Sequence, residues 1–490
     1  MFGRRKPIVE LSTESELGGG LRRLLDVRHL VFLGIGAVVG AGIFSSIGDM
    51  AAGSEGRPGA GPSLVVSYVL TAIACGFAAL CYAEIAAMVP IAGSAYTYAY
   101  VTLGEGVAWI IGWDLIIEYA IGNVYVAQSW TEYLRAFLLG TFGWDFPIWM
   151  ATDMQTAANT PAIAAVAPHV GPWVVAFNLP AFVITALLTL ALCRGVRESA
   201  RINAGLVIGK LMLIVVFLAV GFVHIDTANY TPFAPGGWQG IWTAASIAFF
   251  SYIGFDAIST AAEEVRDPQR SLPRAMLIAL AACAILYVAV ALVMTGLVPS
   301  AQLRTGDPLA FALRSAGLDS LANAMAFGAV VAVTSVLLVF QMGQPRILLA
   351  MARDGLLPPA FARVHPRFGT PAFGTVMTGL FVAIAPSIMT PAQAIELTSI
   401  GTLFAFVLVS LAVLVLRIKE PDRHRPFRVP GYPVTPVLAM ASCLFLMAGL
   451  PASNWWRFAV WLLVGGAIYG LYGRSRSRLG RIAGERNTKS

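Results

Sequence analysis

The chain alternates between apolar stretches of about 20 residues and short segments that carry most of its charge. A helix needs about 20 apolar residues to cross the hydrocarbon core of a bilayer. The pattern therefore predicts an all-α polytopic membrane protein with about twelve transmembrane helices. The expected spans lie near residues 27–50, 62–89, 96–134, 173–193, 201–224, 239–262, 272–298, 319–350, 372–388, 393–417, 434–450 and 456–474.

Two of the expected spans are interrupted by residues that break helices. The first reads GIGAVVGAGIF (34–44), and the second reads FFSYIGFDAISTAAEE (249–264). Unwound backbone in lipid leaves amide and carbonyl groups unpaired at several kcal/mol each, so it persists only where it lines a cavity. Interrupted helices at corresponding places in two halves of a chain indicate the substrate site of a transporter. In the competing interpretation, the glycines only let helices pack closely.

The expected spans divide into groups of five, five and two, and each group of five begins with its broken helix. Because five is an odd number, the second group starts on the opposite side of the membrane and the repeat is inverted. Helices 11 and 12 fall outside the repeat. We expect a cytoplasmic tail at 1–26, repeats at 27–224 and 239–417, helices 11 and 12 at 434–474, and a second cytoplasmic tail at 475–490.

Composition supports a membrane protein and argues against a soluble enzyme. Hydrophobic residues make up 58% of the chain and charged residues only 12%, and the mean hydropathy is +0.75. Most lysines and arginines fall in the two tails and in alternate loops, which places both termini in the cytoplasm. The basic pI of 9.3 reflects this topology, and we expect no nucleic-acid partner.

Five blocks of sequence carry a resemblance to a known family. They are GIGAVVGAGIF, YAEIAAMVPIAGSAYTYAY (82–100), RESARINAGLVIGKLMLIVVF (197–217), FFSYIGFDAISTAAEEVRDPQRSLPRA (249–275) and QPRILLAMARDGLLP (344–358). Together they resemble the amino acid–polyamine–organocation superfamily, and within it a bacterial member of the cationic amino acid transporter family. The resemblance runs over nearly the whole chain, and it implies the inverted repeat and a substrate site at the two breaks.

Backbone groups at the breaks suit the two charges of an amino acid. Where helix 1 unwinds, free N–H groups and the positive end of a helix dipole favour a carboxylate, and free carbonyls favour an ammonium. The expected amide donors are Gly40, Ala41 and Gly42, and the expected carbonyl acceptors are Val38, Val39, Phe250, Ser251 and Ile253.

Apolar side chains around the breaks are candidates for setting substrate size, although ordinary core packing explains each of them equally well. They are Ile43, Phe250, Ile253, Phe255 and Phe340. The resemblance implies that Phe250 acts as a thin gate. No acidic residue lies in the breaks except Asp256, so we expect small neutral L-amino acids such as alanine. Arginine or lysine transport, and amino acid or polyamine exchange, remain alternatives.

Lys210 lies about ten residues into helix 5, inside an apolar segment. A buried ammonium is costly, so an ionisable group inside the membrane is a functional hypothesis. The resemblance aligns Lys210 with a lysine whose ammonium stands where sodium-coupled relatives bind a sodium ion. We expect Lys210 to reach carbonyls of helix 1, with Thr334 or Ser335 as further partners, and to couple transport to protons. The alternative is a permanently charged structural lysine.

Acidic residues on helices 3 and 6 are further candidates. Asp114 and Glu118 are four residues apart, so both can face the bundle interior. The resemblance places Glu118 near the substrate cavity, where it accepts a proton, reaches the ammonium through water or has a structural role. Candidates for a gate or a structural role are Asp114, Tyr252, Asp256, Glu263 and Glu264.

No cofactor is expected from the chain. The cysteines and histidines show no metal-ligand spacing, and no phosphate-binding GxxxxGK[ST] loop is present. Expected partners are an amino acid, a proton and the lipid bilayer, and a small accessory membrane protein is left open. A non-transporting amino acid sensor is a further alternative, but its class usually carries a signalling domain that the short tails lack.

Overall fold

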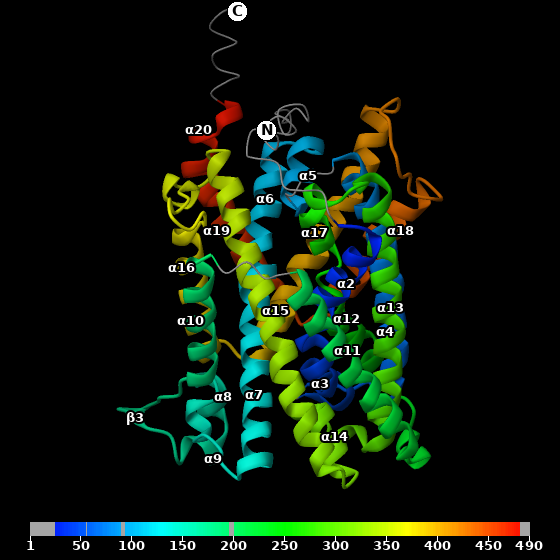
Figure 1. Ribbon diagram of the computed structural model, residues 1–490, viewed down its shortest axis with the longest axis vertical. Coiled ribbons are helices and arrows are strands. Elements are labelled where there is room, and N and C mark those ends of the chain that lie inside the picture. Colours follow the sequence, from blue (N-terminus) through cyan, green and yellow to red (C-terminus); the bar gives the residue numbers. More distant parts are fainter. Residues whose placement is uncertain (1–24, 55, 90–93, 196–199, 481–490) are drawn as a thin grey trace, which may run out of the picture.

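The computed structural model describes residues 25–54, 56–89, 94–195 and 200–480. Within these ranges the chain is mostly helical, with two short antiparallel hairpins (Figure 1). The first part contains α2 (Val27–Val38), η1 (Gly42–Ser46), α3 (Ile47–Ala52), β1 (Gly53–Ser54), β2 (Arg57–Pro58), η2 (Gly61–Ser63), α4 (Leu64–Met88), α5 (Ser94–Thr102), α6 (Glu105–Ile116), η3 (Ile117–Ile121), α7 (Gly122–Phe142), η4 (Ile148–Met150), α8 (Met154–Asn159), α9 (Pro161–Ala164), β3 (His169–Val170), β4 (Trp173–Val174), α10 (Leu179–Cys193) and α11 (Ala200–Val223).

The second part is also built from long helices with short connections. It contains η5 (Thr227–Tyr230), α12 (Gly237–Ala248), η6 (Phe249–Tyr252), η7 (Asp256–Glu264), α13 (Pro268–Leu297), η8 (Ser300–Gln302), α14 (Pro308–Ser315), α15 (Asp319–Arg353), η9 (Pro359–Ala362), α16 (Ala372–Ile384), η10 (Ala385–Ser387), α17 (Pro391–Lys419), α18 (Val434–Ala448), α19 (Ala452–Ile468), η11 (Tyr469–Gly473) and α20 (Arg474–Arg476).

Among the residues that the structure describes, seven continuous helical segments are long and apolar enough to cross a membrane: 61–88, 105–142, 205–223, 237–259, 268–297, 319–353 and 391–419. Two further pairs of helices pass the same test together but are bent, by 45° between α2 and the η1–α3 segment and by 116° between α18 and the α19–α20 segment. Two shorter apolar helices, 179–193 and 372–387, complete the set. These helices overlap all the predicted spans: the first span covers both arms of the α2–α3 pair, and the last two spans are the arms of the α18–α20 pair.

The predicted third span was wrong at both of its ends. Residues near 96–102 form the separate helix α5, and the next helix begins at Glu105 and continues to Phe142. Gly104 has a φ of 100°, and its N–H and that of Leu103 both donate to the Ala99 carbonyl. This helix end was hidden in the sequence because apolar residues continue on both sides of it. Beyond Phe142, the short helices and the β3–β4 hairpin lie at the lower left in Figure 1, and the hairpin extends away from the other helices.

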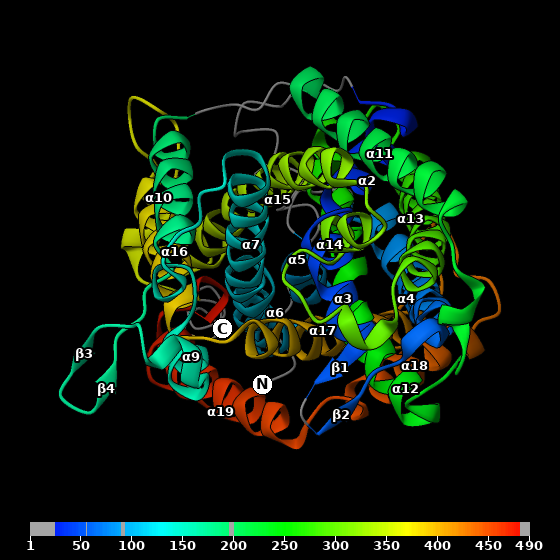
Figure 2. The same ribbon diagram turned by 90° about the horizontal axis from the view of Figure 1, so that it is seen from below.

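The helices pack in pairs that join distant parts of the chain. Helix α4 packs against α13, α7 against α15, and α10 against α16, and each pair lies side by side in Figures 1 and 2. The broken segments lie among these pairs, where α2 contacts α13 and η7 while η1 contacts η6. The interruptions are therefore inside the protein, where protein groups surround their backbone.

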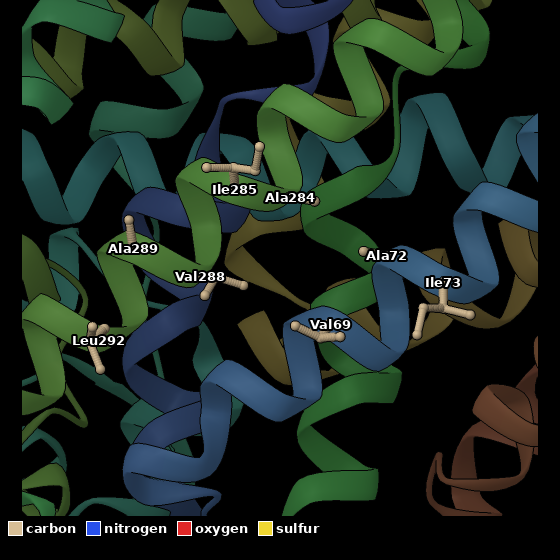
Figure 3. Close-up of a pocket in the computed structure, with 8 residues that line it drawn as sticks. All are labelled: Val69, Ala72, Ile73, Ala284, Ile285, Val288, Ala289 and Leu292. Carbon is tan, nitrogen blue, oxygen red and sulfur yellow. The ribbon is translucent and has the colours of Figure 1, made fainter.

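The outer surface carries many exposed apolar side chains, as a lipid-facing surface does. Ile285 is 74% exposed and Ile73 is 51% exposed, and both belong to a groove of about 670 Å³ between α4 and α13. Figure 3 shows this groove lined by aliphatic side chains from the two helices. Because its lining holds no charged or hydrogen-bonding side chain, the groove suits hydrocarbon better than an amino acid.

Candidate functional site

The break in helix 1 frees backbone donors in the protein interior. Helix α2 stops where Val39 takes a ψ of 98°, and the chain resumes as the π-helical turn η1. The N–H groups of Gly40 and Ala41 donate to no backbone carbonyl in the described chain, whereas the Gly40 carbonyl accepts from the first turn of η1. Two adjacent free amides at a helix start are suited to a carboxylate.

The break in helix 6 has a different geometry. Helix α12 tightens into the 3₁₀ turn η6, Ile253 is extended with a ψ of 136°, and Gly254 has a φ of 115°. A β-carbon on Gly254 would also lie 3.1 Å from the Ala37 backbone, so both conformation and space require glycine there. Asp256 then begins η7, with its carboxyl facing the backbone N–H groups of Gly254 and Ala257.

The two breaks meet directly. A β-carbon on Gly42 would lie only 2.5 Å from the Ser251 Cα, so η1 and η6 approach each other at backbone distance. The Tyr287 hydroxyl on α13 bridges the pair, 3.0 Å from the Val38 carbonyl and 2.8 Å from the Ser251 carbonyl. These two expected ammonium acceptors thus already contact a hydroxyl. Sequence reasoning missed Tyr287, whose only signal was a lone polar atom in an apolar helix.

Lys210 lies beside the first break and its side chain is 3% exposed. Its Nζ donates to the Gly36 carbonyl at 2.5 Å and to the Val39 carbonyl at 2.8 Å, so the ammonium joins α11 to the end of α2. The expected contact with helix 1 carbonyls is confirmed. The hydroxyl of Thr334 donates to Val330 within α15 and accepts from the Trp130 indole, at 2.7 and 2.8 Å.

Buried aromatic side chains surround the breaks. The Phe250 ring meets the Tyr125 ring of α7 edge to face, with centroids 5.1 Å apart. The Phe340 ring packs on Tyr119 with centroids 5.5 Å apart. The aliphatic candidates Ile43 and Ile253 are buried as well.

Phe255 and Tyr252 point away from this group. Phe255 packs between Tyr82 and Phe406 in an aromatic cluster with α4 and α17. Tyr252 contacts the Tyr68 ring and donates to the Tyr68 carbonyl at 3.1 Å.

Three buried carboxyl groups, those of Asp114, Glu118 and Asp256, belong to the third and sixth predicted spans. Asp114 and Glu118 are 1% and 3% exposed, so both face the interior as their spacing predicts. Glu118 interacts electrostatically with Asp114 and Asp256 and lies beside Thr402. Glu118 stands in the π-helical turn η3, and η1 is the other π turn at this site. Such turns frequently mark functional positions. The two carboxyl oxygens of Asp114 find no hydrogen-bond partner among the described residues.

Below the breaks, as seen in Figure 1, side-chain contacts join η1 to α7. The Ser45 and Ser129 hydroxyls share a short hydrogen bond, and the Tyr133 hydroxyl donates to the Phe44 carbonyl. These contacts tie η1 to α7. Together with the Tyr125–Phe250 ring contact, they separate the breaks from the surface at that end.

Two ion pairs join α17 to the segment around α4, and sequence reasoning did not pair their members. At one end, Glu84 binds Arg417 through both carboxylate oxygens, at 3.0 and 2.5 Å. At the other end, Arg57 of β2 pairs with Glu396. The expected inner gate at Glu263 and Glu264 cannot be compared with these pairs, because those two side chains lie outside the described part of the chain.

In the described ranges, no group of three or more His, Cys, Asp or Glu side chains is placed to hold a metal ion. The five cysteines are free thiols, four of them buried. The breaks present the free N–H groups of Gly40 and Ala41 and several backbone carbonyls, with the Lys210 ammonium and buried carboxyl groups nearby. It can bind a zwitterion and exchange protons.

Comparison with known proteins gives consistent results. The sequence profile described as amino acid permease matches residues 25–468. The chain is 43% identical to a methylthioribose transporter of Bacillus subtilis, over 98% of this chain and 99% of the relative. It is also 43% identical to the branched-chain amino acid permease BcaP of the same organism, over 97% and 98% of the two chains. A vacuolar cationic amino acid transporter 4 of Arabidopsis thaliana is 37% identical, over 82% of this chain and 64% of the relative.

Proposed function

Because the chain belongs to the amino acid permease family, an integral membrane family, we propose that it is a secondary active transporter that takes up amino acids together with protons. The observation that carries the proposal is the meeting of the two breaks, with free amides at Gly40 and Ala41 and the Lys210 ammonium beside them. The breaks act as hinges during alternating access.

We propose further that the chain forms about twelve spans with a five-plus-five inverted repeat. Pairing of α4 with α13, α7 with α15 and α10 with α16 supports this. In each pair, a helix of the first half contacts the helix five spans later, as expected for two halves related by a pseudo-two-fold axis in the membrane plane. The basic residues favour cytoplasmic termini. We also propose that the protein lies in a bacterial inner membrane, because two of its relatives are bacterial.

The proposed substrates are small neutral L-amino acids. Buried Phe250 at the second break, and buried Phe340 packed on Tyr119 of η3, would limit the volume for a side chain. The branched-chain permease, a protein similar to this one, is named for apolar amino acids. Cationic amino acids are the second candidate, favoured by the buried carboxyls of Glu118 and Asp256 and by the plant relatives. The methylthioribose transporter adds a neutral sugar to the compounds worth testing.

Lys210 is the proposed coupling residue. Its ammonium occupies the Gly36 and Val39 carbonyls at the end of α2, so its deprotonation would release the hinge from α11. A desolvated lysine can lose its proton near neutral pH. Binding and release of one proton can thus alternate with movement of the hinge.

The test is uptake of labelled alanine, leucine and arginine into proteoliposomes, under an inward proton gradient and then an inward sodium gradient. Alanine or leucine accumulation driven by protons alone is the expected result. Accumulation that requires sodium would contradict the role of Lys210, and arginine uptake without alanine uptake would contradict the substrate class. Exchange of internal for external amino acid without any gradient dependence would identify an exchanger.

A further inference from the structure

A polar cavity lies on the surface side of the contacts that cover the breaks. It has a volume of about 310 Å³ and is lined by segments from η1, α3, α7 and α8 and by the loop 304–306. These segments are at the lower end of the molecule in Figure 1. Tyr125, Ser45 and Ser129 form part of its wall. The contacts of the same residues, Ser45 with Ser129 and Tyr125 with Phe250, lie between this outer cavity and the breaks.

Two opposite charges in the outer cavity are not neutralised by contact. Asp49 of α3 is exposed, and its carboxylate has no hydrogen bond or ion pair to any residue that the structure describes. Arg304 is also exposed and likewise forms no ion pair in that part of the chain. Among the charged groups, Arg304 has the largest electrostatic effect on Asp49, followed by Arg57, yet neither forms an ion pair with it. A gap between a free carboxylate and a free guanidinium matches the two ends of a zwitterion.

The other charged groups of the outer cavity are already partnered. Arg135 binds Asp145 with both nitrogens, at 2.9 and 2.8 Å, and contacts Glu132 at 3.4 Å. Asp153 caps α8 through the Thr156 N–H at 2.8 Å. This contrast distinguishes Asp49 and Arg304 from the rest of the wall.

A buried acceptor in the same wall supports a ligand. Gln128 is only 5% exposed, and its amide nitrogen donates to the Met389 carbonyl at 2.6 Å and the Pro386 carbonyl at 3.2 Å. These bonds orient the amide and leave its Oε1 without a donor among the described groups. A buried acceptor without a donor costs about 1–3 kcal/mol. An ammonium group in the cavity would satisfy it.

We propose that the outer cavity is a separate binding site for the zwitterionic head group of a free amino acid, occupied before the Tyr125–Phe250 contact opens. Asp49 and the Gln128 Oε1 receive the α-ammonium, and Arg304 receives the α-carboxylate. The inference rests on the proposed amino acid transport, and it adds a site at which substrate is captured ahead of the breaks. Recognition of the head group alone makes this site indifferent to the substrate's side chain.

The test compares Asp49→Asn, Arg304→Gln and the charge-swapped pair Asp49→Arg with Arg304→Asp in proteoliposome uptake. Each neutralising change is expected to raise KM about tenfold while kcat stays within twofold, because a charge-assisted hydrogen bond to the substrate is lost. The swapped pair is expected to recover most of the affinity. The matched control is Arg314→Gln, which removes an arginine at the same end that pairs with Asp307 and is expected to leave KM unchanged. An unchanged KM in both neutralised variants would overturn the proposal.

Equilibrium binding of labelled leucine, alanine and arginine to the purified full chain separates this proposal from the proposed function. Two molecules bound per wild-type chain and one per Asp49→Asn, Arg304→Gln chain is the expected result for a transported amino acid. If no amino acid is transported but binding still depends on Asp49 and Arg304, the proposed function fails and the outer site stands. If the protein transports an amino acid but binds only one molecule per chain, and this binding is unchanged by both substitutions, the outer site is wrong and the proposed function stands. No binding of any of the three would overturn both.

Discussion

Replacement of Glu84 by glutamine is expected to destabilise the protein strongly, because this side chain is buried and contacts polar groups of three other residues. It is 1% exposed and receives two hydrogen bonds from Arg417, at 3.0 and 2.5 Å. The Val429 N–H donates to it at 2.7 Å, and the Arg425 Nε lies 3.4 Å away. The contacts join α4 to the end of α17, 333 residues later, and to the loop that follows α17.

The magnitude follows from the burial of the pair. Removing one partner of a buried ion pair costs about 3–5 kcal/mol, because the remaining charge is left uncompensated. Glutamine keeps the shape of the side chain and can still accept from the Val429 N–H. Arg417 is half-buried and also lies over the Tyr432 ring, which partly compensates its charge. We therefore expect a loss near the lower limit, about 3 kcal/mol in the free energy of unfolding.

The assay is equilibrium unfolding in mixed micelles, with Glu420→Gln as the matched control. Glu420 forms an ion pair with Arg423 at 2.7 Å, but its side chain is 37% exposed, so its replacement should cost less than about 1 kcal/mol. Combining Glu84→Gln with Arg417→Gln should recover part of the loss, since the uncompensated charge is gone. A loss in Glu84→Gln no larger than that in Glu420→Gln would refute the reasoning.

Three further predictions address the site and the loops. Under a gradient of one pH unit, proton coupling can concentrate an amino acid at most about tenfold, and Lys210→Met is expected to abolish this accumulation while exchange persists. The control Lys419→Met removes an exposed lysine and is expected to leave accumulation unchanged, and proteoliposome uptake measures both variants. Gly42→Ala should cost about 1–3 kcal/mol or more in unfolding experiments, because the new β-carbon meets the η6 backbone, while Gly76→Ala meets nothing within 4 Å and should be neutral or slightly stabilising. Burial raises the pKa of the Asp307 carboxyl to about 6, so the folded state binds its proton more tightly than the unfolded state. The free energy of unfolding should therefore rise by at most about 3 kcal/mol as the pH falls from about 7 to about 4, and Asp307→Asn should remove this pH dependence.

Much of the candidate site could be located from sequence because a helix break is a local property. The glycines around Gly40 and the Ser251–Asp256 segment stand out against apolar neighbours, and the structure brings these two segments into contact. Lys210 stands out in the same way, as a single charge in an apolar helix, and its reach to the helix 1 carbonyls was predicted. The roles of these residues in transport remain predictions.

Other site residues could not be predicted, since nothing in their local sequence indicates their partners. Tyr287 is one tyrosine in an apolar helix, and only its closeness to the Val38 and Ser251 carbonyls gives it a role. The ring contacts of Phe255 with Tyr82 and Phe406 were likewise not predictable, because they join it to residues far away in the chain.

Local sequence is enough to identify the apolar spans and the two interruptions within them. This follows because the cost of placing a residue in hydrocarbon depends mainly on that residue and its immediate neighbours. The pairing of the charged side chains, in contrast, depends on the packing of the whole protein. Glu84 with Arg417, Arg57 with Glu396, and unpaired Asp49 opposite Arg304 all depend on how far each helix is rotated and how closely the segments approach. An electrostatic contact depends on distances of a few ångströms between residues far apart in the chain, and no local pattern encodes such distances.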